Sequence, residues 1–206
     1  MNGPPLFKIL DVVMNKRPVD SVPYFLPDCC PICGAPTAKD EDGAFLRCTG
    51  VSCPAQLSRN IAHFVSRDAM DIEGLGTAVL EVLVEKGIIR TAADIFTLPK
   101  DEIASIERMG EKSVKNLLNA IENSKTRGLA KLLYALGIGQ IGDKTADSLA
   151  QNYTDIEDFF TVSAEQLVEI DDIGDIVSKC VCDFFAHPST RETIDRLKEA
   201  GVVTAS

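Results

Sequence analysis

Four cysteines within residues 30–53 have the spacing of a metal site. Cys30 and Cys33 are separated by two residues and are followed by Gly34, which lets the chain turn. Cys48 and Cys53 complete the pattern C-x2-C-x14-C-x4-C. Four thiolates at such spacings favour a closed, tetrahedral Zn²⁺ site of the structural kind. Because sulfur would fill every position around the ion, no water can be activated there, and we assign no catalytic residue.

Two points about this cluster stay open in the sequence. Iron occupies four-thiolate sites in rubredoxins, although the wider spacing of the second cysteine pair favours zinc. Cys29 could replace Cys30 as a ligand, although the C-x2-C spacing favours Cys30. The chain has seven cysteines and no signal-peptide pattern at its N-terminus, which favours metal binding over disulfides. The ion would fold a segment of about 25 residues that is too small for a core of its own.

A short turn pattern occurs four times after the cysteines. Each copy has the form apolar-x-x-apolar-Gly, and a helical pattern follows each closing glycine. The glycines lie at positions 76, 110, 142 and 174, and such a nearly constant period is typical of stacked supersecondary units. The repeat also has a longer period. Shifting the sequence by 64 residues aligns Asp94–Leu98 with Asp158–Val162, and shifting it by 66 aligns Ala69–Ile72 with Ala135–Ile138. The sequence therefore predicts four helix-hairpin-helix motifs in two duplicated pairs.

The repeated turn is suited to anion binding. Its glycine would supply a backbone conformation and a close approach that a Cβ atom blocks. The turn would also expose unpaired N–H groups at the start of the next helix, where the helix dipole favours negative charge. We therefore expect the turns to contact phosphates of a nucleic-acid backbone. The candidate contact residues are Gly74, Gly76, Thr77, Arg108, Gly110, Lys112, Gly142 and Lys144.

The four turns differ in charge. Lys112 and Lys144 each follow the glycine of their turn by two residues, where an ammonium group could join the backbone donors. The fourth turn lies within residues 155–175, which contain eight acidic residues and no lysine or arginine. Because an anion would be repelled there, we expect the fourth motif to serve as a packing partner. The first turn, with both glycines and acids, is intermediate.

From Pro54 onward the sequence has a helical pattern. Arg59, His63 and Arg67 lie on or beside the face opposite the apolar residues of this first helix. This basic face fits solvent exposure and phosphate contact equally well. Capping-box patterns predict further helix starts at Thr91 with Asp94, Thr154 with Glu157 and Ser163 with Gln166.

Composition and charge limit the classes of function. The 206 residues are 45% hydrophobic and 25% charged, as in soluble globular proteins, and no run of about 18 apolar residues predicts a membrane span. The net charge of −10 argues against a general polyanion binder, but the acidic excess is local. Residues 131–206 hold 14 acidic against 6 basic residues, whereas residues 54–130 hold 11 against 10. The central region therefore remains compatible with nucleic acid.

These patterns predict a mainly α fold in three segments. Residues 1–27 contain one strand pattern, Phe7–Met14, and a proline-rich connector, and would be a short β remnant of a larger unit. Residues 28–54 would form the four-cysteine zinc finger, and residues 55–206 the helix-hairpin-helix domain.

Several runs of the sequence, in this order, resemble bacterial NAD-dependent DNA ligases. The resemblance spans residues 16–203 and implies the end of an oligonucleotide-binding fold, a four-cysteine zinc finger and a four-motif helix-hairpin-helix domain. For the parent enzyme it implies nick sealing, in which a lysine adenylated from NAD passes AMP to the 5′-phosphate for attack by the 3′-hydroxyl. The runs are Cys30–Gly34, Arg47–Gly50, His63–Arg67, Met70–Gly76, Val84–Gly87 and Leu133–Ile138.

The adenylated-lysine motif and a C-terminal BRCT-type domain of that family have no counterpart here. We therefore expect the chain to be inactive alone and to supply the DNA grip. Zn²⁺ would be structural, while NAD and Mg²⁺ would act only through the missing adenylation domain. The implied partners are nicked double-stranded DNA and the remaining ligase domains. We expect a monomer in the cytoplasm, associated with the nucleoid and not with a membrane.

Two other functions are compatible with the motifs. One is a free-standing zinc and helix-hairpin-helix accessory protein that binds DNA without ligase activity. The other is a helical repeat scaffold for proteins, because the period also suits tetratricopeptide-type arrays, although the glycine turns and the zinc knuckle disfavour it.

Overall fold

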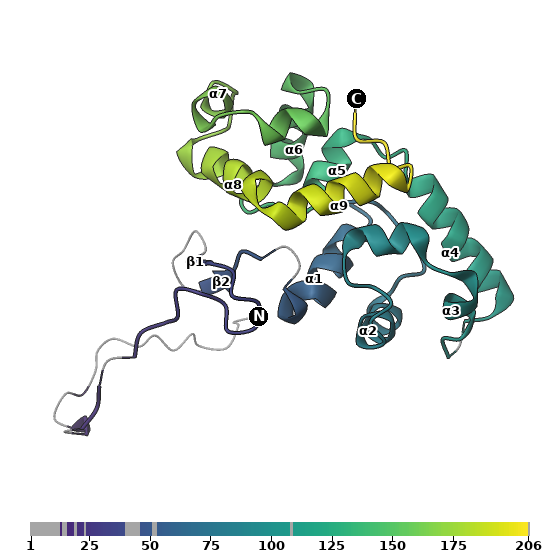
Figure 1. Cartoon of the computed structure of the whole chain (residues 1–206), viewed down its shortest axis with the longest axis horizontal. Coiled ribbons are helices and arrows are strands. Elements are labelled where there is room, and N and C mark those ends of the chain that lie inside the picture. The colour runs from purple at the N-terminus through teal and green to yellow at the C-terminus, as the bar shows by residue number, and fades with distance from the viewer. Residues whose placement is uncertain are drawn as a thin grey trace, which may run out of the picture.

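Figure 1 shows a computed structural model of the chain, with a small cysteine-rich finger beside a larger helical region. The structure describes residues 13, 16–18, 20–22, 24–39, 46–50, 53–107 and 109–205. The strand expected over Phe7–Met14 lies outside the described residues, apart from Val13, and so does the candidate contact residue Arg108.

The finger is built on a short antiparallel hairpin. Strand β1 (Thr37–Lys39) pairs with β2 (Leu46–Cys48), in the register that places Thr37 opposite Cys48. Such short strands cannot form a stable sheet alone. The finger therefore depends on another source of stability, and the cysteines that flank both strands are the candidates.

The helical region consists of two similar halves. The first half contains α1 (Pro54–Phe64), α2 (Thr77–Glu85), the 3₁₀ helix η2 (Ala92–Thr97), α3 (Lys100–Ala104) and α4 (Glu111–Ser124). The second contains α5 (Leu129–Ala135), α6 (Asp143–Asn152), the 3₁₀ helix η3 (Ile156–Phe160), α7 (Ala164–Val168) and α8 (Asp175–Ala186). A last helix, α9 (Pro188–Glu199), follows.

The two halves repeat as the sequence predicts. The first half contains helix starts at positions 92, 100 and 111, for η2, α3 and α4. The second half contains starts at positions 156, 164 and 175, for η3, α7 and α8, so each lies 64 residues after its counterpart. Helix α6 begins 66 residues after α2. Within the halves, α1 packs on α2, α3 on α4, α5 on α6 and α7 on α8. The prediction of a mainly α fold, with a zinc-finger segment followed by tandem helix-hairpin-helix pairs, is thus confirmed.

One continuous core runs through both halves. In α4, the buried residues Val114, Leu117 and Ile121 recur at three- and four-residue spacing and so share one face. In α5, Leu129, Leu132 and Leu133 are buried in the same core. Burial of each such side chain contributes about 1.5–3 kcal/mol.

No helix in the described part of the chain is both long and apolar enough to cross a bilayer.

Side-chain caps begin several helices. The predicted capping boxes of Thr91 with Asp94 and of Ser163 with Gln166 are confirmed. The predicted start at Thr154 is wrong by one residue, because Asp155 and Asp158 form the box of η3. The Asp155 carboxylate accepts a hydrogen bond from the N–H group of Glu157, and aspartate caps a helix at least as well as threonine.

Asp94 also joins η2 to α9. Its carboxylate accepts hydrogen bonds from the N–H groups of Arg90 and Thr91, at 2.8 and 2.7 Å, and from the guanidinium group of Arg196. Burial raises the pKa of Asp94, but the Arg196 guanidinium and the two N–H donors outweigh it and hold the pKa below its usual value.

Replacing Asp94 with Asn should destabilise the protein by about 1–3 kcal/mol at neutral pH, because the charged acceptor is lost. With a lowered folded-state pKa, the carboxylate contributes its full stability above the unfolded-state pKa of about 4 and loses it as the pH falls through the folded-state value. The difference in unfolding free energy between wild type and variant, measured in urea, should therefore shrink below about pH 4. The exposed Asp101→Asn variant is the control; a difference independent of pH would contradict the assignment.

Candidate metal centre and nucleic-acid interface

The structure brings the four predicted ligand sulfurs together. The Sγ atoms of Cys30, Cys33, Cys48 and Cys53 all lie within 4.8 Å of one another. The Sγ atoms of Cys30 and Cys53 are 3.7 Å apart, and those of Cys33 and Cys48 are 3.3 Å apart. Zn–S bonds of about 2.3 Å in a tetrahedron require S–S separations of about 3.8 Å. The donor set therefore fits a structural zinc ion. Cys29 is exposed and lies outside this group.

Backbone turns hold the cysteines in place. The N–H group of Gly34, at a φ of +73°, donates to the carbonyl of Cys30 at 2.9 Å, and the N–H group of Cys30 donates to Ala35 O at 2.8 Å. These bonds close the first knuckle. A left-handed φ is strained for residues with a Cβ, so glycine suits this turn.

Gly50 has a role that the spacing of the cysteines does not indicate. A Cβ atom at this position would lie 2.9 Å from Ala35 Cβ and 3.0 Å from Cys33 Sγ, so a side chain would push the knuckles apart. Its N–H group donates to Cys48 Sγ at 3.2 Å. Gly50 thus allows the second cysteine pair to approach the first.

The thiols of Cys30 and Cys48 differ in acidity. The N–H groups of Cys33 and Ile32 lower the pKa of the Cys30 thiol to about 6. Burial raises the pKa of Cys48 to about 12, and its contacts with the thiols of Cys33, Cys30 and Cys53 also raise it. A divalent cation bound among the sulfurs would stabilise the thiolate form of all four.

The metal site leads directly into the helical region. Cys53 is the N-cap residue of α1. Gln56, in the first turn of α1, donates from Nε2 to the carbonyl of Cys48 at 3.0 Å. The direction of the finger relative to α1 is therefore determined by the cysteine cluster.

The four hairpin turns present uncapped helix starts. Gly76, Gly110, Gly142 and Gly174 are the N-cap residues of α2, α4, α6 and α8, and provide no side chain for capping. By contrast, η2, η3, α7 and α9 have side-chain caps. The first N–H groups of a helix have no partner within it. At these four turns they are therefore left to solvent or to a ligand.

The conformational reason expected for these glycines is wrong. Their φ values lie between −67° and −95°, which any residue can adopt. At the first, third and fourth turns, the left-handed residue stands two positions earlier: Gly74 at +100°, Gln140 at +65° and Asp172 at +67°. Apart from the glycine itself and its two chain neighbours, no atom of the described residues lies within 4 Å of a Cβ built at any of the four closing glycines. What glycine provides at these positions is open space in front of the helix start.

Two basic side chains support the turns from outside them. Arg127 donates to the carbonyls of Arg67 and Ala69 and lies 3.6 Å from the carboxylate of Asp71. Lys131 forms a 2.6 Å ion pair with Asp143, which is adjacent to Gly142. Each of these cations offsets an acid at the first or third turn. Sequence reasoning missed both, because neither lies in a turn.

The predicted cations occupy exposed positions. Lys112 and Lys144 are exposed in the first turns of α4 and α6, and Thr77 is exposed at the start of α2. Arg67 is exposed as well, and Arg59 lies on the surface of α1. His63 does not join this basic face: it is half-buried, and its Nε2 lies 2.8 Å from the carbonyl of Tyr134.

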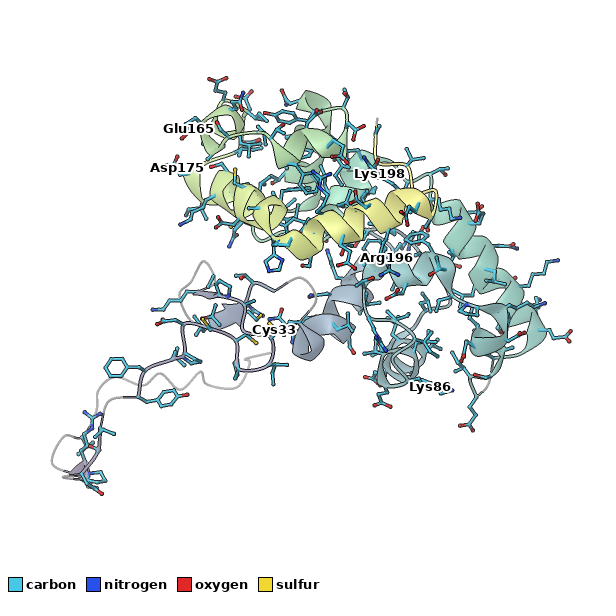
Figure 2. All side chains as sticks on the ribbon, viewed as in Figure 1. Cys33, Lys86, Glu165, Asp175, Arg196 and Lys198 are labelled. Atoms are coloured by element: carbon cyan, nitrogen blue, oxygen red, sulfur yellow. The ribbon has the colours of Figure 1, made fainter. Side chains whose placement is uncertain are left out.

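The fourth turn has the same backbone but a different surface. Asp171, Asp172 and Asp175 are exposed, and Ile176, 70% exposed, stands where the second and third motifs carry lysine. Figure 2 shows Asp175 beside Glu165 of α7. These acidic side chains oppose the attraction of the uncapped helix start for an anion, which is consistent with the packing role expected for this turn.

Replacing Cys33 with Ser should release the metal and unfold the finger, because binding energy of a structural zinc ion is folding energy for so small a segment. The helical region, which has its own core, should keep its circular dichroism signal. Zinc content by elemental analysis is the measurement, and Cys29→Ser is the matched control that should retain one equivalent. Equal zinc content in both variants would count against the ligand set.

Comparison with known proteins covers most of the chain. Residues 30–55 match the NAD-dependent DNA ligase C4 zinc finger domain, residues 66–123 a SAM-like helix-hairpin-helix tandem, and residues 131–194 a helix-hairpin-helix motif. The chain is 48% identical over 199 residues to a DNA ligase of Caldicellulosiruptor bescii and 45% identical over 199 residues to one of Myxococcus xanthus. These alignments cover 97% of this chain and 30% of each relative. In sequence and fold, the chain matches the zinc-finger and helix-hairpin-helix portion of NAD-dependent DNA ligases.

Proposed function

We propose that this chain grips nicked duplex DNA by its sugar-phosphate backbone, as the DNA-binding part of a ligase that forms phosphodiester bonds in replication and repair. The observation that carries this proposal is the set of exposed, uncapped helix starts at repeated turns. Two of them have a free-standing lysine within the first helical turn, since no described residue forms an ion pair with Lys112 or Lys144.

The physical basis is the polarity of the helix start. Unpaired N–H groups and the positive end of the helix dipole attract a phosphate oxygen. Open space beyond Gly110 and Gly142 would let the phosphate approach the amides closely. Helices α4 and α6, of 14 and 10 residues, are long enough to carry such a dipole. Lys112 and Lys144 would add Coulombic attraction.

Contacts of this kind hold DNA without reading its sequence. They involve phosphates and main-chain groups, so affinity should be independent of base sequence and should fall with salt. The second and third turns would contribute most. The first turn, where Arg127 offsets Asp71, would contribute less, and the fourth turn would not contact DNA.

The remaining assignments follow from the same proposal. Zn²⁺, held by the four cysteines, would brace the finger against α1, and no residue of the described chain is assigned a catalytic role. NAD and Mg²⁺ would serve the adenylation chemistry of the other ligase domains, which are the proposed protein partners. The division into segments 1–27, 28–54 and 55–206, the monomeric state and a cytoplasmic, nucleoid-associated location remain predictions.

Changing Lys144 to Glu should weaken binding to a nicked duplex. It should also reduce the slope of log affinity against log salt concentration by about the amount that corresponds to one phosphate contact. Fluorescence anisotropy with a labelled duplex at several salt concentrations would measure both quantities. Lys179→Glu, an equal charge change on the exposed face of α8, is the control and should have a smaller effect. Equal losses in the two variants would favour a diffuse electrostatic effect over a contact at the third turn.

Changing Gly142 to Ala tests the open space directly. Because φ is −88° and no atom contacts a Cβ there, the unfolding free energy should change by no more than about 1 kcal/mol. Duplex affinity should nevertheless fall several-fold, since the methyl group would stand between phosphate and amides. Gly174→Ala, the same change on the same backbone in the fourth motif, should leave affinity unaltered. Loss of affinity in both variants, or in neither, would contradict the assignment of the turns.

A further inference from the structure

The last part of the chain connects the two halves of the helical region. Helix α9 lies between α8 in the second half and η2 in the first, and contacts both. In Figure 1 it runs across the region as a single straight helix. With the segment that follows it, α9 forms what we call the strap, residues 188–205.

The strap is tied to the first half through Arg196. Its Nη2 donates to Asp94 Oδ1, and its Nη1 donates to Thr91 Oγ1 at 3.1 Å. Both acceptors belong to the capping box at the start of η2. Further along, the N–H group of Val203 donates to the carbonyl of Lys125, at the end of α4, at 2.8 Å.

The strap is tied to the second half through Glu157 in η3. Arg191 and Lys198 each form an ion pair with Glu157, at 2.6 and 2.5 Å, and the Arg191 guanidinium lies 3.4 Å from the centre of the Phe160 ring. The Lys198 and Arg191 cations lower the pKa of Glu157. The N–H group of Ile156 also donates to Thr204 O at 3.0 Å. Figure 2 shows Arg196 and Lys198 on the same helix.

These ties join equivalent points of the duplicated fold. η3 is the counterpart of η2 in the second half, and the strap bonds to both of them from successive turns of one helix. The halves also meet where α1 packs on α5, with His63 Nε2 near the carbonyl of Tyr134. The α1–α5 junction and the strap therefore both help to set the relative position of the halves in the described part of the chain.

We propose that the strap holds the second and third turns at a fixed spacing, so that both halves engage one duplex at once. This inference rests on the proposed function and assigns Arg196 and Glu157 as positioning residues for DNA binding. Two sites that are held rigidly at the right span bind with an effective concentration that raises affinity by about 10²–10⁴ over either site alone. If the halves can rotate about the α1–α5 junction, that gain falls.

The ion pairs can be removed without unfolding the strap. The side chains of the Glu157 pairs are 33–44% exposed, and pairs of this kind contribute little to stability. Asp94, whose side chain is 16% exposed, keeps its two backbone N–H donors when Arg196 is replaced. The buried residues Thr193, Ile194 and Leu197, and the backbone bonds of Val203 and Ile156, remain in such variants.

The test is affinity as a function of duplex length. Arg196→Gln combined with Glu157→Gln removes the Arg196–Asp94 pair and both pairs of Glu157, and leaves the net charge unchanged. Anisotropy would be measured for wild type and variant with nicked duplexes of about one and about two helical turns, each turn being about 10 base pairs. We expect wild type to gain at least about tenfold in affinity on the longer duplex. The variant should keep wild-type affinity for the short duplex and lose most of that gain.

Controls separate this inference from the proposed function. Glu192→Gln combined with Lys179→Gln changes exposed residues of α9 and α8 with the same charge balance and should keep the gain. Arg196→Lys, which retains a cation opposite Asp94, should keep part of it. If the double variant does not fold, the single variants, which change net charge in opposite directions, should each lower the gain.

The role of the strap would be overturned if the folded double variant gained as much affinity on the longer duplex as wild type does. It would also be overturned if wild type itself gained none. Either result would leave duplex binding intact. A wild-type protein that binds neither duplex would instead overturn the proposed function.

Discussion

The N–H groups at the start of a helix need partners that the helix itself cannot supply. Most helices of a globular protein solve this with a side-chain cap, as Ser163 does for α7. Four helices of this fold begin instead at exposed glycines, each after a tight turn that directs those groups outward. The fold thus maintains a regular set of unsatisfied donors on its surface. Apolar packing elsewhere must stabilise the helices, and the shared core of the two halves does so.

Duplication explains both the regularity of the donors and their differences. Each turn needs the same backbone to bury its apolar residues, so the fourth keeps its left-handed residue at Asp172. The surface of the turn is under no such constraint. Ile176 and three aspartates therefore replace the lysine-bearing surface of the third turn without disturbing α8. Packing preserves the shape of the motif, whereas charge decides whether that shape can hold a phosphate.

The cysteine cluster and the strap position this surface from its two ends. The cluster compensates for a hairpin too short to be stable alone, and through Cys53 and Gln56 it sets how the finger meets α1. The strap joins η2 to η3 with a few charged side chains around a buried apolar face. In both places a small number of polar contacts supplies geometry, while the stabilisation comes from a metal site or from apolar burial.

The sequence by itself determined what depends on local chemistry: the ligand spacing of Cys30 to Cys53, the period of the turns, the caps at Thr91 and Ser163, and the resemblance to ligases. These features repeat or lie within a few residues, so they can be read along the chain. The tertiary structure decided what depends on residues distant in sequence. Arg127 reaches Ala69, beside the first turn, from 58 residues away, and Arg196 reaches Asp94 from 102. Such contacts leave no periodic pattern, because only packing of the two halves brings their partners together.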